Sequence, residues 1–256
     1  MSAVTEPRSV SPVRGLYWIS EGFTLVFQSP FGWLSVMTIW FLFTLLCSIF
    51  WGFGPVLFSL TLPIFFAGLM VGCEKVHQGQ SLKVRHLFLG FNLNNPRLVG
   101  LGGVNVFWEV VLSIVTLIWG GQHMTAFQGM VFDSNANLEE LQVLVSDLTP
   151  MFITLSLVQL LLLVLGWYAP ALLIFTPISL IQAITISGKA CAINILPILF
   201  YLAAMGAILV AISITLFTLP LLGVLLGLFV VPTITASVYI SYSDVFKEEG
   251  LPTSSF

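Results

Sequence analysis

The chain has 256 residues, of which 58% are hydrophobic and only 7% are charged, whereas a soluble globular domain carries roughly 25% charged residues. The net charge of −3, with no basic patch among aromatic residues, argues against nucleic-acid binding. Three stretches, 22–73, 148–188 and 190–243, contain no Asp, Glu, Lys or Arg. Because a membrane-spanning helix needs roughly 20 apolar residues, the two longest stretches each predict a hairpin of two spans.

The first 12 residues are polar, and we expect them to be a disordered cytoplasmic tail without a cleaved signal peptide. Residues 13–28 then place Leu16, Phe23 and Phe27 on one helical face and Arg14 on the other. This spacing predicts an amphipathic helix that lies in the membrane interface. Such a helix either docks on lipid as a sensor or connects and caps the bundle, and we favour the second interpretation. Two later segments share the pattern: residues 81–91 and 177–195.

Six membrane spans are predicted: 31–51, 55–73, 98–120, 151–173, 196–217 and 221–242. The paired spans of each hairpin are separated by Gly and Pro residues, which interrupt a helix. The acidic residues of segment 121–149 predict a polar outer loop there. The predicted fold class is therefore all-α, a single polytopic membrane helix bundle over residues 13–246 with interfacial amphipathic helices. Residues 247–256 are expected to form a second cytoplasmic tail.

The positive residues orient the bundle. With six spans, all eight Lys and Arg fall on one side of the membrane, and the opposite loops contain none. Positive residues collect on the cytoplasmic side, so both termini are expected in the cytoplasm. A helical bundle without the alternation of a β-barrel is typical of the cytoplasmic, or inner, membrane of a bacterium.

A weak internal duplication joins the first hairpin to the last. The segment from Leu62 to Gly68 resembles the segment from Val231 to Ser237, and Gly54 and Gly223 match at the same offset. Chance similarity between apolar segments is the competing explanation. Small residues four positions apart let two membrane helices approach closely, which predicts four helix-packing positions: Gly68, Gly72, Ser237 and Ser241.

Glu109 is the one ionisable residue well inside a predicted span. Asn105, Glu109 and Ser113 are spaced four apart and share a helical face, and Gln159 lies at about the same depth in the next span. An intramembrane carboxyl is a candidate functional group by default. Hydrogen bonds between Glu109 and Gln159 would join the two helices, and a proton or cation relay is the alternative. We favour the structural role because no second acid or cation lies at similar depth.

The sequence contains no motif of a known catalytic, metal or cofactor site. Cys47, Cys73 and Cys191 are scattered through apolar segments, which is typical of packing residues and not of a disulfide framework. We therefore predict that the chain is not an enzyme and needs no cofactor or metal.

Several segments rich in aromatic residues, Gly and Pro resemble a family of uncharacterised multi-pass inner-membrane proteins of proteobacteria. These segments are 14–19, 28–33, 62–68, 166–170 and 241–246, and the resemblance extends over residues 14–246. It implies a fold and a location but carries no active-site residue, since the family has no established activity.

Two function classes follow from the sequence. The first is a non-catalytic membrane component that acts through helix packing and through partners, which are the lipid bilayer, other membrane proteins or further copies of the chain. The alternative is a small-solute or proton/ion-coupled transporter that uses the Glu109 face. Carriers break their helices near the midplane of the membrane. The prolines that could break the predicted spans, Pro63, Pro170 and Pro232, lie towards the cytoplasmic ends instead, and this favours the first class.

Overall fold

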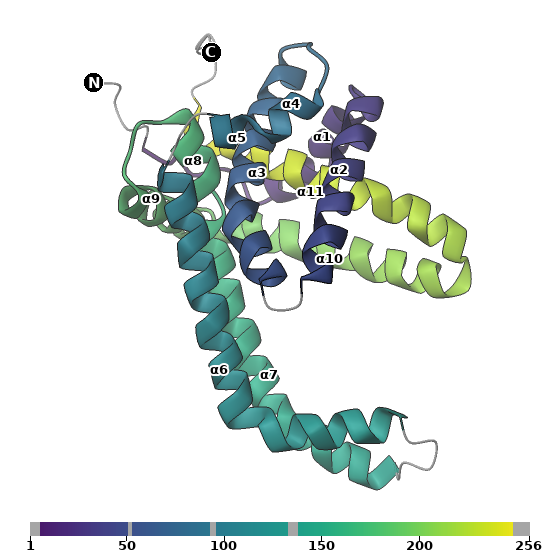
Figure 1. Cartoon of the computed structure of the whole chain (residues 1–256). Helices are drawn as coiled ribbons and strands as arrows, with labels where there is room; N and C mark the ends of the chain where they lie inside the picture. The colour runs from purple at the N-terminus through teal and green to yellow at the C-terminus, as the bar shows by residue number, and fades with distance from the viewer. Residues whose placement is uncertain (1–5, 51–52, 93–95, 133–137, 248–256) are drawn as a thin grey trace. The chain divides into compact units, whose positions relative to one another are not determined.

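The computed structural model describes residues 6–50, 53–92, 96–132 and 138–247, and within them all regular secondary structure is helical (Figure 1). In chain order the helices are α1 (Arg14–Phe27), α2 (Pro30–Ile49), α3 (Gly54–His77), α4 (Val84–Leu87), α5 (Leu89–Asn92), α6 (Pro96–Phe132), α7 (Leu138–Gly166), α8 (Ala169–Phe175), α9 (Leu180–Ile193), α10 (Ile195–Thr218) and α11 (Pro220–Phe246). The predicted all-α class is confirmed. Among the described residues, six stretches are long and apolar enough to cross a membrane: Pro30–Ile49, Gly54–His77, Pro96–Gly121, Gln142–Phe175, Ile195–Thr218 and Pro220–Phe246.

The chain divides into two compact units, where the sequence suggests one membrane domain over 13–246. Unit 1 comprises the residues up to 102 together with those from 165 onward, and unit 2 comprises residues 103–164. Unit 2 is the middle part of the chain and contains most of α6 and α7, so the chain leaves unit 1 once and returns to it once.

Helix α1 is built into unit 1, where it packs mainly against α11 and α10. Its buried residues are Gly15, Trp18, Gly22, Leu25 and Val26. The apolar residues predicted to face the membrane interface, Leu16, Phe23 and Phe27, lie on the other side of α1 and are 42–51% exposed. The reason is steric, because only the glycine-bearing side of α1 can approach the backbone of α11 closely.

The hairpins α2–α3 and α10–α11 are closed by the same device. A side chain on Gly54, in the first turn of α3, would meet the carbonyl group of Cys47 in α2. A side chain on Gly223, in the first turn of α11, would meet the backbone of Leu216 in α10. Each glycine therefore lets the second helix begin against the backbone of the first. This shared contact favours the duplication over chance similarity.

The fourth predicted span, 151–173, is not one continuous helix. Helix α7 ends at Gly166, and α8 begins at Ala169 with Pro170 in its first turn. Proline has no backbone N–H and suits the start of a helix, so it begins a new helix here instead of extending α7. At the break, the backbone N–H of Tyr168 donates to the Ser187 hydroxyl at 3.0 Å.

In unit 2, α6 and α7 run side by side as a hairpin (Figure 1). The predicted polar loop over 121–149 is wrong, because α6 continues to Phe132 and α7 begins at Leu138; residues 133–137 lie outside the described part of the chain. Glu139 and Asp147 are exposed on α7. Leu144, Leu148 and Met151 are buried at helical spacing on the same helix.

The predicted disordered tail is ordered where it is described, from residue 6 onward. The Arg8 backbone N–H donates to the carbonyl of Val245 at 3.0 Å, and the Val10 N–H donates to Asn194 Oδ1 at 2.8 Å. Asn194 returns a hydrogen bond through Nδ2 to the Arg8 carbonyl at 3.0 Å. A two-way amide contact of this kind fixes an extended segment much as a β-ladder does. Residues 1–5 and 248–256 lie outside the described chain.

Candidate functional site

A buried carboxylate joins the ends of α3 and α11 in unit 1. Glu74, only 8% exposed, accepts hydrogen bonds from the Tyr239 hydroxyl at 2.7 Å and from Gln78 Nε2 at 3.2 Å. It also forms an ion pair with the ammonium group of Lys247, which is 34% exposed. Each Glu74 oxygen therefore has a partner, as a buried charge requires.

A second charged group joins α1 to the end of α11. The Arg14 guanidinium contacts Asp244 through Nη2 at 2.6 Å and Glu21 through Nη1 at 2.8 Å. The indole N–H of Trp18 donates to the same Asp244 oxygen, Oδ2, at 2.8 Å. Trp18 itself is fully buried, so this hydrogen bond ties a core side chain to the charged end of the unit.

These contacts form what we call the end network: Arg14, Trp18, Glu21, Glu74, Tyr239, Asp244 and Lys247. Its charged members are paired with one another, so the network fastens helices together and presents no unpaired nucleophile or base. Sequence reasoning missed it. The available signal was that Glu21, Glu74 and Asp244 lie on the side of the membrane to which all Lys and Arg were assigned.

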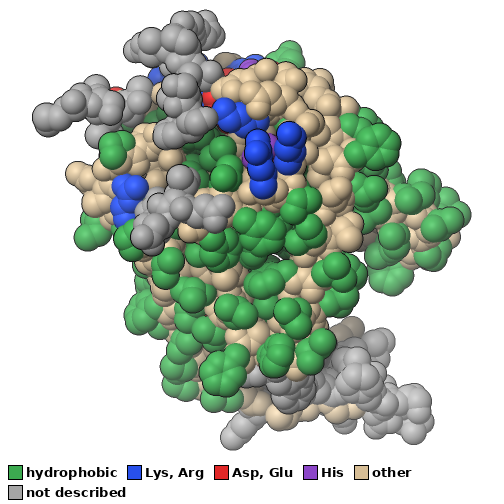
Figure 2. All heavy atoms as spheres, turned by 45° about the horizontal axis from the view of Figure 1, so that its top comes forward, with side chains coloured by type: hydrophobic (Ala, Val, Ile, Leu, Met, Phe, Trp, Pro, Cys, Tyr) green, Lys and Arg blue, Asp and Glu red, His purple; other side chains and the backbone are tan. Residues whose placement is uncertain are grey.

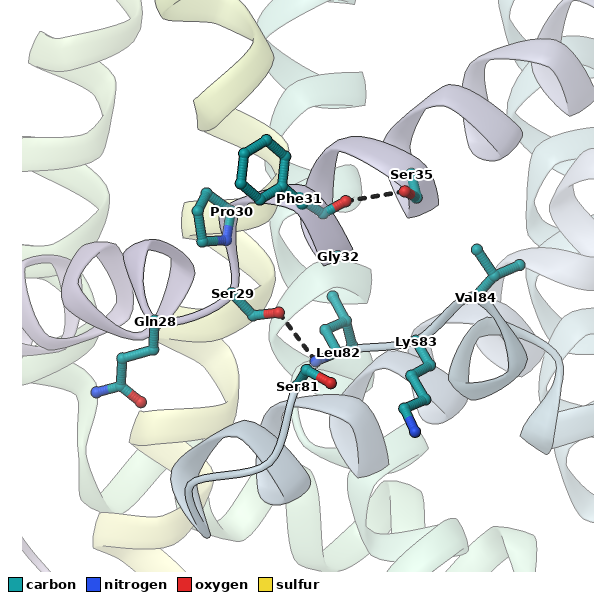
Figure 3. A pocket seen from close by; sticks show the side chains of 10 residues that line it. All are labelled: Gln28, Ser29, Pro30, Phe31, Gly32, Ser35, Ser81, Leu82, Lys83 and Val84. Carbon is teal, nitrogen blue, oxygen red and sulfur yellow. Dashed lines mark hydrogen bonds between the residues drawn. The ribbon is translucent and has the colours of Figure 1, made fainter.

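A cavity of about 540 Å³ lies where α1 passes into α2, in unit 1. It is lined by Gln28, Ser29, Pro30, Phe31, Gly32, Ser35, Ser81, Leu82, Lys83 and Val84 (Figure 3). A hydrogen bond of 3.0 Å from the Leu82 backbone N–H to the Ser29 hydroxyl holds its two walls together. Lys83 is the one charged residue among these lining residues.

The segment after Lys83 is positively charged. His86, only 4% exposed, accepts a hydrogen bond through Nδ1 from the Lys83 backbone N–H at 3.1 Å. Burial lowers the pKa of His86, and the nearby charges of Arg85, Lys83 and Lys75 lower it further. The imidazole is therefore held neutral by its surroundings, and the local potential favours anions. Figure 2 shows Lys and Arg side chains gathered beside a histidine.

The predicted intramembrane cluster lies in unit 2, on α6 and α7. Glu109, Ser113 and Gln159 are exposed, and Asn105 is half-buried. Within the described residues no hydrogen bond joins Glu109 to Gln159, so the expected link between the two helices is not formed. The cluster is instead on the outside of its hairpin, with apolar neighbours such as Val110, 49% exposed, around it.

The four predicted packing residues are all buried in unit 1. A side chain on Gly68 would meet the backbone oxygens of His86 and Leu87 at 2.5 and 2.7 Å, so α4 rests directly on α3. Gly72 lies against the Leu82 and His86 side chains. Ser237 lies against α1, and Ser241 accepts a hydrogen bond from the Trp167 indole at 3.5 Å.

The three cysteines are buried and unbridged. Among the described residues, no group of three His, Cys, Asp or Glu could hold a metal ion. Comparisons with protein-family models, with curated proteins and with solved structures find no match to this chain. Fold and composition nevertheless define the class. Within the described part of the chain, six helical stretches long and apolar enough to cross a membrane make it an all-α integral membrane protein.

Proposed function

We propose that the chain is a non-catalytic component of the bacterial cytoplasmic membrane that acts through helix packing and membrane-protein partners. Two features support a role without catalysis. The charged groups of the end network are paired with one another, and the cysteines are buried. From the resemblance described above, we also propose that the chain is a member of that family of proteobacterial inner-membrane proteins.

The observation that carries the partner role is the exposed position of Glu109. A carboxyl group at mid-depth in a membrane is costly unless it finds polar partners or water. Glu109 and Gln159 are both exposed in unit 2, and no hydrogen bond to Glu109 is found within the described residues. A polar side chain on the helix of another membrane protein, or of a second copy, would satisfy them. Hydrogen bonds between membrane helices contribute roughly 0.6–2 kcal/mol each.

The test compares two substitutions of Glu109 in full-length protein extracted in mild detergent. Glu109→Leu should reduce the yield of co-purifying membrane protein about three- to thirtyfold, as expected for one lost interhelical hydrogen bond. Glu109→Gln should keep most of the yield, because the amide still forms hydrogen bonds. Val110→Leu is the matched control, since it alters the next exposed residue without removing a polar group.

The same pair of variants separates the transporter alternative. Glutamine cannot gain or lose a proton, so Glu109→Gln would abolish proton-coupled flux in liposomes if the carboxyl were a relay. If Glu109→Gln loses proton-coupled flux but keeps its partners, the chain is a transporter and the proposed function is wrong. Equal yields of co-purifying protein for wild type and Glu109→Leu would also contradict the proposed partner role.

We further propose that both termini lie in the cytoplasm, with the end network and the α4 segment on that side. The support is the one-sided distribution of Lys and Arg. A cysteine introduced at position 135 should react with an impermeant thiol reagent in intact spheroplasts. Reaction only after lysis would place that segment in the cytoplasm and overturn the orientation.

A further inference from the structure

We propose that the cavity between Gln28 and Val84 binds the phosphate headgroup of an anionic phospholipid, with Lys83 as the cation that recognises it. This inference is independent of the partner proposed for Glu109, because the cavity lies wholly in unit 1. Its volume of about 540 Å³ lies in the range of roughly 300–1,000 Å³ typical of small-molecule sites.

The lining of the cavity suits a phosphate ester. Lys83 supplies an ammonium group, and Gln28 and Ser81 supply an amide and a hydroxyl as further donors (Figure 3). None of the ten lining residues is acidic, so nothing within the cavity repels an anion. Lys83 takes part in no ion pair found among the described residues, whereas Arg14 and Lys247 do. Its charge is thus available to a ligand.

The walls of the cavity are held in place by packing. The Leu82 carbonyl comes so close to Gly32 that a side chain there would collide with it. Ser29, 7% exposed, accepts the Leu82 N–H, and Leu82 itself is 3% exposed. The segment that carries Ser81 and Lys83 is therefore fixed against the start of α2, which gives a preformed site instead of a mobile loop.

An exposed apolar stripe on α2 favours a lipid over a free phosphate. Phe31, 83% exposed, lies at the cavity, and Leu34, Leu42 and Leu45 continue from it at helical spacing with exposures of 45–58%. These residues belong to a stretch long and apolar enough to cross the membrane. A lipid whose headgroup sits beside Lys83 would run its acyl chains along this stripe. A soluble phosphate would make no use of it.

Lipid titration of the full-length protein in mild detergent tests the proposal. Dioleoylphosphatidylglycerol should remain bound in native mass spectrometry and raise Tm, while dioleoylphosphatidylcholine and inorganic phosphate should do neither. Lys83→Gln should weaken phosphatidylglycerol binding about tenfold or more, because a charge-assisted hydrogen bond is lost. Lys83→Arg should preserve binding. Lys189→Gln is the matched control, since Lys189 on α9 is 58% exposed and does not line the cavity.

Three results would overturn the assignment. Equal binding of the two lipids would show that the site does not recognise an anionic headgroup. Unchanged affinity in Lys83→Gln would show that Lys83 does not bind the lipid. Protection by inorganic phosphate without protection by the lipid would make the ligand a soluble phosphate. If Lys83→Gln does not fold, the wild-type titration is repeated at rising salt. Screening should weaken a headgroup contact at the surface, so an affinity independent of salt would likewise refute the proposal.

Discussion

Lys247→Ala is expected to lower the free energy of unfolding more than Glu74→Gln does, although both break the same ion pair. Without Lys247, the Glu74 carboxylate stays buried at 8% exposure with only Tyr239 and Gln78 as partners. Removing one member of such a pair leaves an uncompensated charge. Because Lys247 is itself 34% exposed, water reduces that cost, and we expect a loss of about 1–3 kcal/mol.

Glu74→Gln should cost about 1 kcal/mol or less. The glutamine carbonyl still accepts from Tyr239, and the Lys247 ammonium can turn to water. Unfolding with rising SDS in mixed micelles, followed by circular dichroism, measures the difference. The control is Lys189→Ala, whose ion pair with Glu6 spans 3.9 Å between exposed side chains and should contribute at most about 0.5 kcal/mol. If Lys247→Ala unfolds like this control, the end network does not stabilise the chain.

The membrane helices could be located from sequence because the property that defines them is local. A charge-free apolar stretch must be a helix in lipid, whatever it packs against, since its backbone groups have no other hydrogen-bonding partners. The α2–α3 and α10–α11 hairpins and the helical nature of α1 and α9 follow from composition and spacing alone. The break between α7 and α8 is also predictable from the sequence, because Pro170 lies at the start of α8.

The sequence does not predict which side of α1 packs against protein, because burial depends on the partner. Periodicity identifies two sides of a helix but does not say which side meets protein and which meets lipid when both carry apolar residues. The deciding feature is the pair of glycines, Gly15 and Gly22, which lie against backbone atoms of α10 and α11. The contacts of the end network could not be predicted from the sequence for the same reason, since Arg14 and Asp244 are 230 residues apart in the chain.

The segment 121–149 shows a different limit. Its acidic residues predict a loop only when the spacing of the apolar residues between them is ignored. Leu144, Leu148 and Met151 recur at helical spacing within it, which indicates an amphipathic helix. Asn105, Glu109 and Ser113 all lie in α6, but whether their side of the helix is covered depends on contacts that no local pattern encodes.

Gly22→Ala should destabilise unit 1 by about 1–3 kcal/mol, because the added methyl group has no room. It would lie 2.5 Å from the Ser237 hydroxyl oxygen and 2.7 Å from the Ser237 backbone nitrogen. The hydroxyl is held by its hydrogen bond to the Thr233 carbonyl at 2.7 Å, and the backbone of α11 cannot move without moving its neighbours. Helix α1 must therefore shift away from α11, and the Trp18–Asp244 hydrogen bond would be strained with it.

Gly206→Ala is the matched control for this prediction. Gly206 lies within α10 in the same unit, and a side chain there meets nothing within 4 Å. Alanine should be neutral at that position or stabilise the helix by about 0.4–1 kcal/mol, since it restricts the unfolded chain. Adding Ser237→Gly to Gly22→Ala should recover part of the lost stability, because it removes the hydroxyl oxygen, the nearest of the three Ser237 atoms that crowd the methyl group. Equal SDS unfolding midpoints for Gly22→Ala and Gly206→Ala would mean that α1 and α11 do not depend on this close contact.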